Sequence, residues 1–159
     1  MLEFNEAGLL VPPSIIASTL EEFRNYFAIE SAGDVRNKLF ENYTAYVEEL
    51  KKISGIEKLK QLIDGSFVTK KENPQDIDLV VFIDYDVFED NSSKLKKFVY
   101  PDSVIAYGLD CYIVKVYPET HKLYFAYKAD MAYWISQFDK TKPGKRNKRT
   151  PKGFLEIIV

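Results

Sequence analysis

The sequence is poor in the residues that form covalent or zinc cross-links. Among its 159 residues there is one cysteine, Cys111, and one histidine, His121. A single cysteine cannot close an internal disulfide, and a histidine without cysteine or histidine companions does not predict a zinc site. A chain of this length buries a sufficient core without such links. We therefore expect one domain with no disulfide partner, in a reducing compartment such as the cytoplasm.

Long hydrophobic runs and an excess of charge are also missing. No apolar stretch approaches the about 18 residues of a membrane helix, and the start, Met-Leu-Glu-Phe-Asn-Glu, carries acids where a signal peptide has basic residues. Lys plus Arg total 22 against 24 Asp plus Glu, which gives a formal net charge of −2. This balance excludes a globally basic nucleic-acid coat, and we expect a soluble protein with no membrane partner.

Aromatic residues are plentiful, with 11 Phe and 11 Tyr, and the apolar pattern alternates between helical and strand periods. A Thr19–Glu22 capping box predicts a short helix through about Ala28, after an extended lead-in over 1–18. Spacings of three and four predict long helices over 34–53 and 119–138, and Trp134 of the second is assigned to the core rather than to a base-stacking platform. Runs rich in β-branched residues predict strands over 77–83, 109–116 and 154–159. A mixed α/β or α+β domain follows.

The most informative segment holds two acids two residues apart, Asp76 and Asp78. Side chains alternate along a strand, so both carboxylates are expected on one face while Ile77 and Leu79 point into a core. Carboxylates this close repel each other unless a proton or a cation lies between them. Magnesium, a hard ion that prefers carboxylate oxygens, is the expected occupant. The alternative is a pair of solvated acids on an edge strand.

Two further features accompany this pair. Gly65-Ser66 follows a short apolar run, and such a turn permits close approach of a phosphate to backbone N–H groups and to the Ser66 hydroxyl. Asp110 lies in an apolar strand, where an acid is costly unless it is paired or binds a metal; otherwise it is a strand-end residue that meets solvent. Phosphoryl or nucleotidyl transfer requires both features together: groups that donate hydrogen bonds to a phosphate, and carboxylates that bind metal ions.

In this order, Gly65-Ser66, Asp76-x-Asp78 and Asp110 resemble the signature of the DNA polymerase β-type nucleotidyltransferase superfamily. The chain looks most similar to small bacterial single-domain members, including minimal nucleotidyltransferases that act as antitoxins. The spacing of Gly-Ser-Phe and Asp-Ile-Asp-Leu, with Lys-Gly near the last strand, is also similar to an uncharacterised bacterial family. The motif covers residues 62–83 and 109–114 and leaves 1–55 and the last 20 residues unexplained.

The resemblance implies a small mixed β-sheet backed by helices. We expect a single nucleotidyltransferase-like domain over 1–159, in which residues 1–55 form an N-terminal helical extension. The resemblance also implies a magnesium-dependent enzyme that uses a nucleoside triphosphate such as ATP, with two Mg²⁺ ions or Mn²⁺ in their place. Asp76, Asp78 and Asp110 would be catalytic and would bind the metals, and Gly65 and Ser66 would bind the nucleotide. The acceptor would be a hydroxyl of a protein, an RNA or a small molecule.

The last loop is strongly basic, with seven cations between residues 140 and 152. Such a run is either a solvated loop or a contact for a polyanion, a triphosphate or an RNA, and the candidates are Lys145, Arg146, Lys148 and Arg149. A different class of function also stays open: a catalytically silent binding module that keeps the fold, such as an antitoxin-like partner protein. An exposed apolar patch on the helix over 34–53 would favour that alternative.

Overall fold

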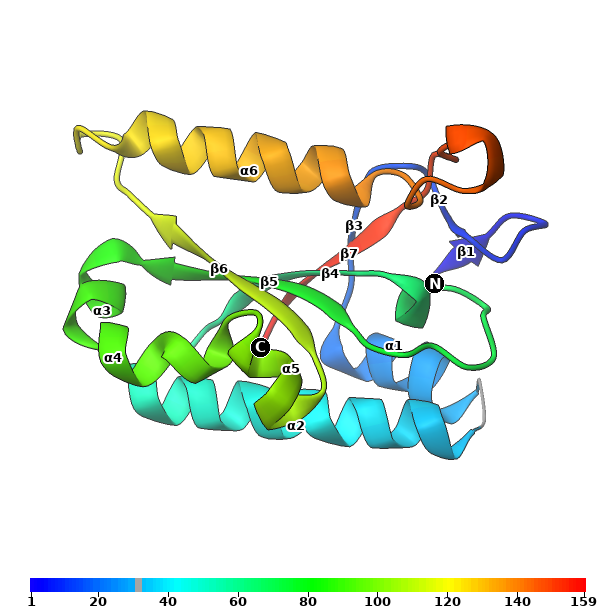
Figure 1. The fold of residues 1–159 in the computed structure, drawn as a ribbon, viewed down its shortest axis with the longest axis horizontal. Helices are drawn as coiled ribbons and strands as arrows, with labels where there is room; N and C mark the ends of the chain where they lie inside the picture. Colours follow the sequence, from blue (N-terminus) through cyan, green and yellow to red (C-terminus); the bar gives the residue numbers. More distant parts are fainter. Residues whose placement is uncertain (31–32) are drawn as a thin grey trace.

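The computed structural model describes residues 1–30 and 33–159, which form one mixed sheet with helices on both faces (Figure 1). The strands are β1 (Glu3–Phe4), β2 (Leu10–Val11), β3 (Ile15–Ala17), β4 (Lys60–Asp64), β5 (Asp78–Asp84), β6 (Asp110–Val116) and β7 (Phe154–Ile158). The α-helices are α1 (Leu20–Arg24), α2 (Asp34–Ser54), α3 (Tyr85–Asp90), α4 (Ser92–Leu95), α5 (Asp102–Tyr107) and α6 (Tyr124–Phe138). A π-helical turn (Asn25–Ile29) extends α1, and short 3-10 turns cover Ser66–Val68, Lys96–Phe98 and Lys145–Asn147.

The main sheet has the strand order β3-β7-β4-β5-β6. Strands β3 and β7 are parallel, as are β5 and β6, whereas β4 is antiparallel to both of its neighbours. The predicted α/β (α+β) class with a small mixed sheet backed by helices is confirmed. Strands β1 and β2 form a separate antiparallel pair.

The two faces of the sheet carry separate hydrophobic clusters. Helices α1 and α2 and the short helices between β5 and β6 cover one face, and α6 lies along the other (Figure 1). The larger cluster packs the buried stripe of α2, which includes Tyr43, Tyr46 and Leu50, against Ile63 and Leu79 of the sheet. The smaller cluster packs α6 against alternate residues of the central strands. Alternation along each strand therefore decides which helical layer a side chain meets.

Several elements agree with the sequence-based expectations. The Oγ1 atom of Thr19 accepts a hydrogen bond from the Glu22 amide and caps α1 as predicted. Helix α2 ends at Gly55, whose φ of +72° is the left-handed conformation that favours glycine after a helix. Cys111 alternates away from Asp110 along its strand, which predicts a core residue, and it is buried, free and part of the core. The run Ser31-Ala32-Gly33-Asp34 predicts a break between the first two helices, and residues 31 and 32 of this run lie outside the described residues.

Other elements differ from the expectations. The second long helix begins at Tyr124 and not near Glu119, because Pro118 and His121 form tight turns instead. The sequence also predicts a short helix from Ser92 or Ser93 through Val99, and α4 with the 3-10 turn after it forms this segment. Helices α3 and α5 are additional helices that the pattern does not predict. The expected extended lead-in over 1–18 contains three short strands, of which Ile15–Ala17 joins the main sheet beside β7, a pairing that the sequence does not predict. In the described part of the chain, no helix is long and apolar enough to cross a membrane.

Candidate functional site

Three aspartates form a row across neighbouring strands. Asp64, the last residue of β4, lies opposite Asp78, the first residue of β5, and Asp78 lies opposite Asp110, the first residue of β6. Like charges directly opposite one another destabilise a sheet unless something neutralises them. The same alternation that sends Leu62, Val80 and Val114 into the α6-side cluster places the three acids on that face. The row therefore extends the α6-side layer beyond the end of the helix.

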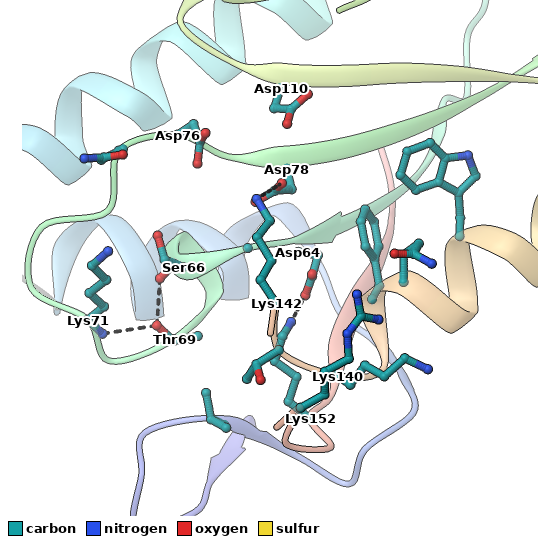
Figure 2. Close-up of a pocket in the computed structure, with 18 of the residues that line it drawn as sticks. Asp64, Ser66, Thr69, Lys71, Asp76, Asp78, Asp110, Lys140, Lys142 and Lys152 are labelled. Atoms are coloured by element: carbon teal, nitrogen blue, oxygen red, sulfur yellow. Dashed lines mark hydrogen bonds and ion pairs between the residues drawn. The ribbon is translucent and has the colours of Figure 1, made fainter. Parts of the chain in front are cut away.

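A pocket of about 690 Å³ opens over this row (Figure 2). Its volume falls within the roughly 300–1,000 Å³ that is typical of small-molecule sites. The lining includes residues from β4, β5, β6, the end of α6 and the basic loop. All five residues predicted to carry chemistry line it, namely Gly65, Ser66, Asp76, Asp78 and Asp110. The structure therefore brings together residues that are up to 45 positions apart in the sequence.

The strand that carries the predicted acid pair begins later than expected. Strand β5 starts at Asp78, so Asp76 lies in the segment that leads into the strand and not on the strand itself. The prediction that alternation along one strand aligns the two side chains is therefore wrong. Asp76 still lies close enough for its charge to raise the pKa values of Asp78 and Asp110. Figure 2 shows the three carboxylates grouped at the same end of the sheet.

Gly65 is fixed by its contact with Asp78. Its φ of +85° is left-handed, and a β-carbon on it would lie 1.8 Å from Oδ2 of Asp78. Only glycine fits between the end of β4 and this carboxylate. The 3-10 turn that follows is tied by the Thr69 hydroxyl, which donates to the Ser66 carbonyl at 2.7 Å. The Ser66 side chain thus borders the pocket beside the acid row.

Arg36 of α2 holds the other side of this turn, and the sequence analysis did not identify it. The side chain is buried, and Nη1 donates to the carbonyls of Phe27 and Phe67 at 3.1 and 2.8 Å. Nη2 donates to the carbonyl of Thr69 at 2.8 Å and to that of Lys71. The signal in the sequence is an arginine three residues before Leu39, at a position that continues the apolar stripe of α2. One guanidinium therefore fixes the loop that follows Ser66.

Two lysines of the basic loop reach the acid row. Lys152 is buried and its Nζ contacts Oδ1 of Asp64, while Nζ of Lys142 lies 3.4 Å from Oδ1 of Asp78. Burial raises the pKa of Asp64 to about 6, although the Lys152 charge opposes the shift. Asp64 was not predicted as a site residue; the signal was an acid that closes the apolar run Leu62-Ile63. The basic loop over 140–152 therefore contacts two acids of the pocket and is not only a solvated loop.

The four loop cations proposed as polyanion contacts are not equivalent. Arg149 lines the pocket, together with Lys140, Lys142 and Lys152. Arg146 and Lys148 are exposed and are not part of its lining. The side chain of Lys145 lies outside what the structure describes. The cations at the pocket are therefore mostly residues that the sequence did not single out.

Asp110 differs from its two neighbours in the row. Its Oδ1 atom is buried and has no hydrogen-bond partner within residues 1–30 and 33–159. Burial, together with the Asp76 charge, raises the pKa of this carboxyl, although a side-chain hydrogen bond with Tyr112 opposes the shift. A buried oxygen without a partner is costly, so it indicates a site for a proton or a ligand that donates or is positively charged.

The donor chemistry of the pocket bears on the predicted magnesium. Among the described residues, no three His, Cys, Asp or Glu side chains are arranged so that they could hold one metal ion together. Magnesium usually takes only one or two carboxylates and completes its shell with water and substrate phosphates. Asp78 and the unpartnered oxygen of Asp110 match that donor chemistry, and the Lys142 ammonium shows that Asp78 already attracts a cation. The residues present therefore fit an ion that arrives with a phosphate ligand.

The apolar residues at the end of α6 form the remaining wall of the pocket. Trp134 packs on the α6-side cluster, in agreement with its assignment to the core, and it also lines the pocket. By contrast, the apolar stripe of α2 is buried against the sheet, and Val35 is the one large hydrophobic residue of α2 that is exposed in the described structure. Helix α2 thus lacks the apolar patch expected of a docking surface.

Comparisons with known proteins give a family without a known activity. No curated protein and no solved structure matches the chain. A family model matches residues 2–158, which include every element of the sheet and the whole pocket lining. The chain therefore belongs to the family of unknown function DUF6932.

Proposed function

We propose that this protein is a magnesium-dependent nucleotidyltransferase that moves a nucleotide from a nucleoside triphosphate to a hydroxyl group. The observation that supports it most is the row Asp64, Asp78 and Asp110, with Gly65 packed against its centre and a buried, unpartnered oxygen on Asp110. Burying several carboxylates close together costs free energy, and these carboxylates line an open pocket. This combination indicates a functional site and not a packing role.

Asp76, Asp78 and Asp110 would hold two Mg²⁺ ions, or Mn²⁺ in their place. The ions would neutralise the charge of the triphosphate and make the α-phosphorus more electrophilic. In the absence of ligand, Lys142 neutralises part of the charge on Asp78, and the carboxylates otherwise repel one another. A bound cation would relieve this repulsion, so the acids favour ligand binding by their own electrostatics.

The chain's own residues would divide the remaining work. Ser66 and the loop cations Lys142 and Arg149 border the pocket and would bind the phosphates. The acceptor hydroxyl would attack the α-phosphorus, forming a new P–O bond while the bond to the leaving pyrophosphate breaks. Asp110 would accept the hydroxyl proton.

The test separates binding from turnover. Wild type and Asp110→Asn are compared for calorimetric binding of Mg²⁺–triphosphate and for transfer of a radiolabelled α-phosphate to any acceptor in cell lysate. The variant should bind within about tenfold of wild type and lose transfer by roughly 10²–10⁴-fold, because general-base assistance is typically worth that much. Absence of labelling by wild type with all four common nucleoside triphosphates would refute the enzyme.

The alternative is a catalytically silent module of the same fold, such as an antitoxin-like partner protein. The ion pairs of Lys142 and Lys152 with two of the acids favour it, because they neutralise carboxylates that an active site would leave free. Triphosphate binding with no labelled product would support this alternative. The acceptor class, whether protein, RNA or small molecule, is read from the labelled product itself.

A further inference from the structure

An aromatic wall closes one end of the pocket. It consists of Tyr112 from β6 and of Tyr133 and Trp134 from α6, all of which line the pocket. The ring centroids of Tyr112 and Trp134 are 4.6 Å apart, and those of Tyr133 and Trp134 are 5.2 Å apart. Trp134 and Tyr112 are partly buried, and Tyr133 is 55% exposed. The wall is thus anchored on the core and still accessible to a ligand.

The position along the strands sets where this wall lies relative to the phosphate side. The acid row lies where β4 ends and where β5 and β6 begin, so Ser66, which follows β4, lies outside the row, and Tyr112, two residues into β6, lies on its inner side. Tyr112 is two residues after Asp110, so the two side chains share a face of β6. In Figure 2, Ser66, Thr69 and Lys71 lie on one side of the carboxylates and the end of α6 lies on the other. The acid row therefore separates a polar, phosphate-type end from an aromatic end.

We propose that the aromatic wall binds the nucleobase of the triphosphate donor; this inference rests on the proposed function. A nucleoside triphosphate has a highly charged end and a flat aromatic end, joined by the phosphorus at which transfer occurs. With its outer phosphates at Ser66 and its α-phosphate over the acids, its base reaches the opposite end of the pocket. Bases of every kind stack on aromatic side chains, because each presents a π-face.

Gln137 adds a polar group to the same wall. It lies one helical turn after Tyr133 on α6 and lines the pocket. Its amide offers both a hydrogen-bond donor and an acceptor, which can read the edge of a base. The wall therefore supplies stacking, and Gln137 supplies discrimination between bases.

The chain carries its own reporter, because Trp134 is its single tryptophan. Wild type is titrated with ATP, GTP, CTP, UTP and inorganic tripolyphosphate, each with Mg²⁺, while indole fluorescence and calorimetric heat are recorded. Tripolyphosphate carries the charge of the donor without its base. At least one nucleotide should quench the fluorescence and bind roughly 5- to 150-fold more tightly than tripolyphosphate, the range expected for one stacked base.

Variants localise the effect and guard against simple loss of folding. Trp134→Leu and Tyr133→Leu should reduce nucleotide affinity towards that of tripolyphosphate and leave tripolyphosphate binding unchanged, whereas Trp134→Phe should keep most of the affinity. Phe125→Ala is the matched control, since Phe125 is a 70% exposed aromatic residue of α6 that does not line the pocket. Unchanged tripolyphosphate binding shows that each variant is folded.

Two outcomes would overturn the inference in distinguishable ways. If nucleotides and tripolyphosphate bind with equal affinity, or quench equally, the base does not contact the wall and the proposed function stands without it. If neither nucleotide nor tripolyphosphate binds, the proposed function fails and the inference fails with it. If Trp134→Phe loses as much affinity as Trp134→Leu, an aromatic face is not what the ligand requires, and the stacking role is refuted.

Discussion

A β-carbon on Gly65 would lie 1.8 Å from Oδ2 of Asp78, so the turn and the central acid of the site are built as one unit. The contact joins the end of β4 to the start of β5, where the two strands are in register. Any side chain at residue 65 has to displace the Asp78 carboxylate. The geometry of the acid row therefore requires glycine at residue 65.

Gly65→Ala should lower the free energy of unfolding by about 2 kcal/mol or more and abolish triphosphate binding. The backbone of residue 65, with φ +85° and ψ −168°, is essentially restricted to glycine and costs about 1–3 kcal/mol for another residue, and the clash with Asp78 adds to it. Gly55→Ala is a control for a positive φ alone, because Gly55 has φ +72° and ψ 10° and a β-carbon on it would meet nothing within 4 Å. Urea denaturation measures both. Equal losses in the two variants would mean that the Asp78 contact is unimportant.

Asp76→Asn and Asp78→Asn should each abolish magnesium-dependent triphosphate binding and leave the fold intact. Burial first, and then the charges of Asp76 and Asp110, raise the pKa of Asp78, so a neutral amide there should slightly stabilise the ligand-free protein. Asp84→Asn serves as control, since Asp84 is an exposed acid at the far end of β5. Calorimetry with and without a chelator is the measurement. Equal affinity in wild type and both variants would remove these acids from the site.

The contribution of each loop cation to triphosphate binding should depend on whether it lines the pocket, and not on the total number of cations in the loop. Lys142→Ala and Arg149→Ala should weaken triphosphate binding, because both residues line the pocket, while Arg146→Ala and Lys148→Ala should not. Each lost phosphate contact also reduces the salt dependence of binding, so titrations are run at two salt concentrations. A uniform effect of all four substitutions would indicate a diffuse electrostatic attraction and not a set of contacts in the pocket.

The buried carboxyl of Asp64 should give the protein a characteristic pH dependence of stability. Burial raises the pKa of Asp64 to about 6, whereas an unfolded aspartate titrates near about 3.9. Between about pH 4 and 6 the folded chain therefore binds more protons than the unfolded chain, so the free energy of unfolding falls as the pH rises through this window and then levels off. Asp64→Asn should lack this component, which is on the order of 1–3 kcal/mol.

This difference is measured by urea denaturation of wild type and Asp64→Asn between pH 4 and 7 in the presence of a chelator. The stability of wild type relative to the variant should increase as the pH falls from about 6 to about 4. Because Asp78 and Asp110 also have raised pKa values, both proteins keep a common background of the same sign. Parallel curves would show that Asp64 has an ordinary pKa.

The sequence predicted the elements whose signals are local. The apolar stripe of α2 and the β-branched runs of β5 and β6 are periodic patterns, and they form where expected. The short helices α3 and α5 have too few residues for a period to emerge, and β3 forms because β7, more than a hundred residues later, offers it an edge. Short elements take their conformation from neighbours that a local pattern does not contain.

The residues of the site likewise fall into those with a local sequence signal and those that only the fold brings together. Gly65, Ser66 and the acids were found because their spacing along the chain is informative. The contact of Lys152 with Asp64 spans 88 residues, and the wall formed by Trp134 depends on where α6 ends relative to the sheet. A helical stripe shows that a residue faces inward, but it does not show whether the sheet or a cavity lies opposite. The core position of Trp134 was therefore predicted from the stripe, whereas its place in the lining of the pocket was not.

The hydrogen bonds from Arg36 to the carbonyls of Phe67, Thr69 and Lys71 restrict local unfolding of the loop after Ser66. Opening this loop would strand a guanidinium inside the core, so the loop cannot unfold locally at low cost as exposed loops usually do. Its amides should exchange with solvent as slowly as those of α2. The conformational entropy of residues 66–71 is lost when the chain folds and not when a ligand arrives, so the loop is already ordered before it binds anything.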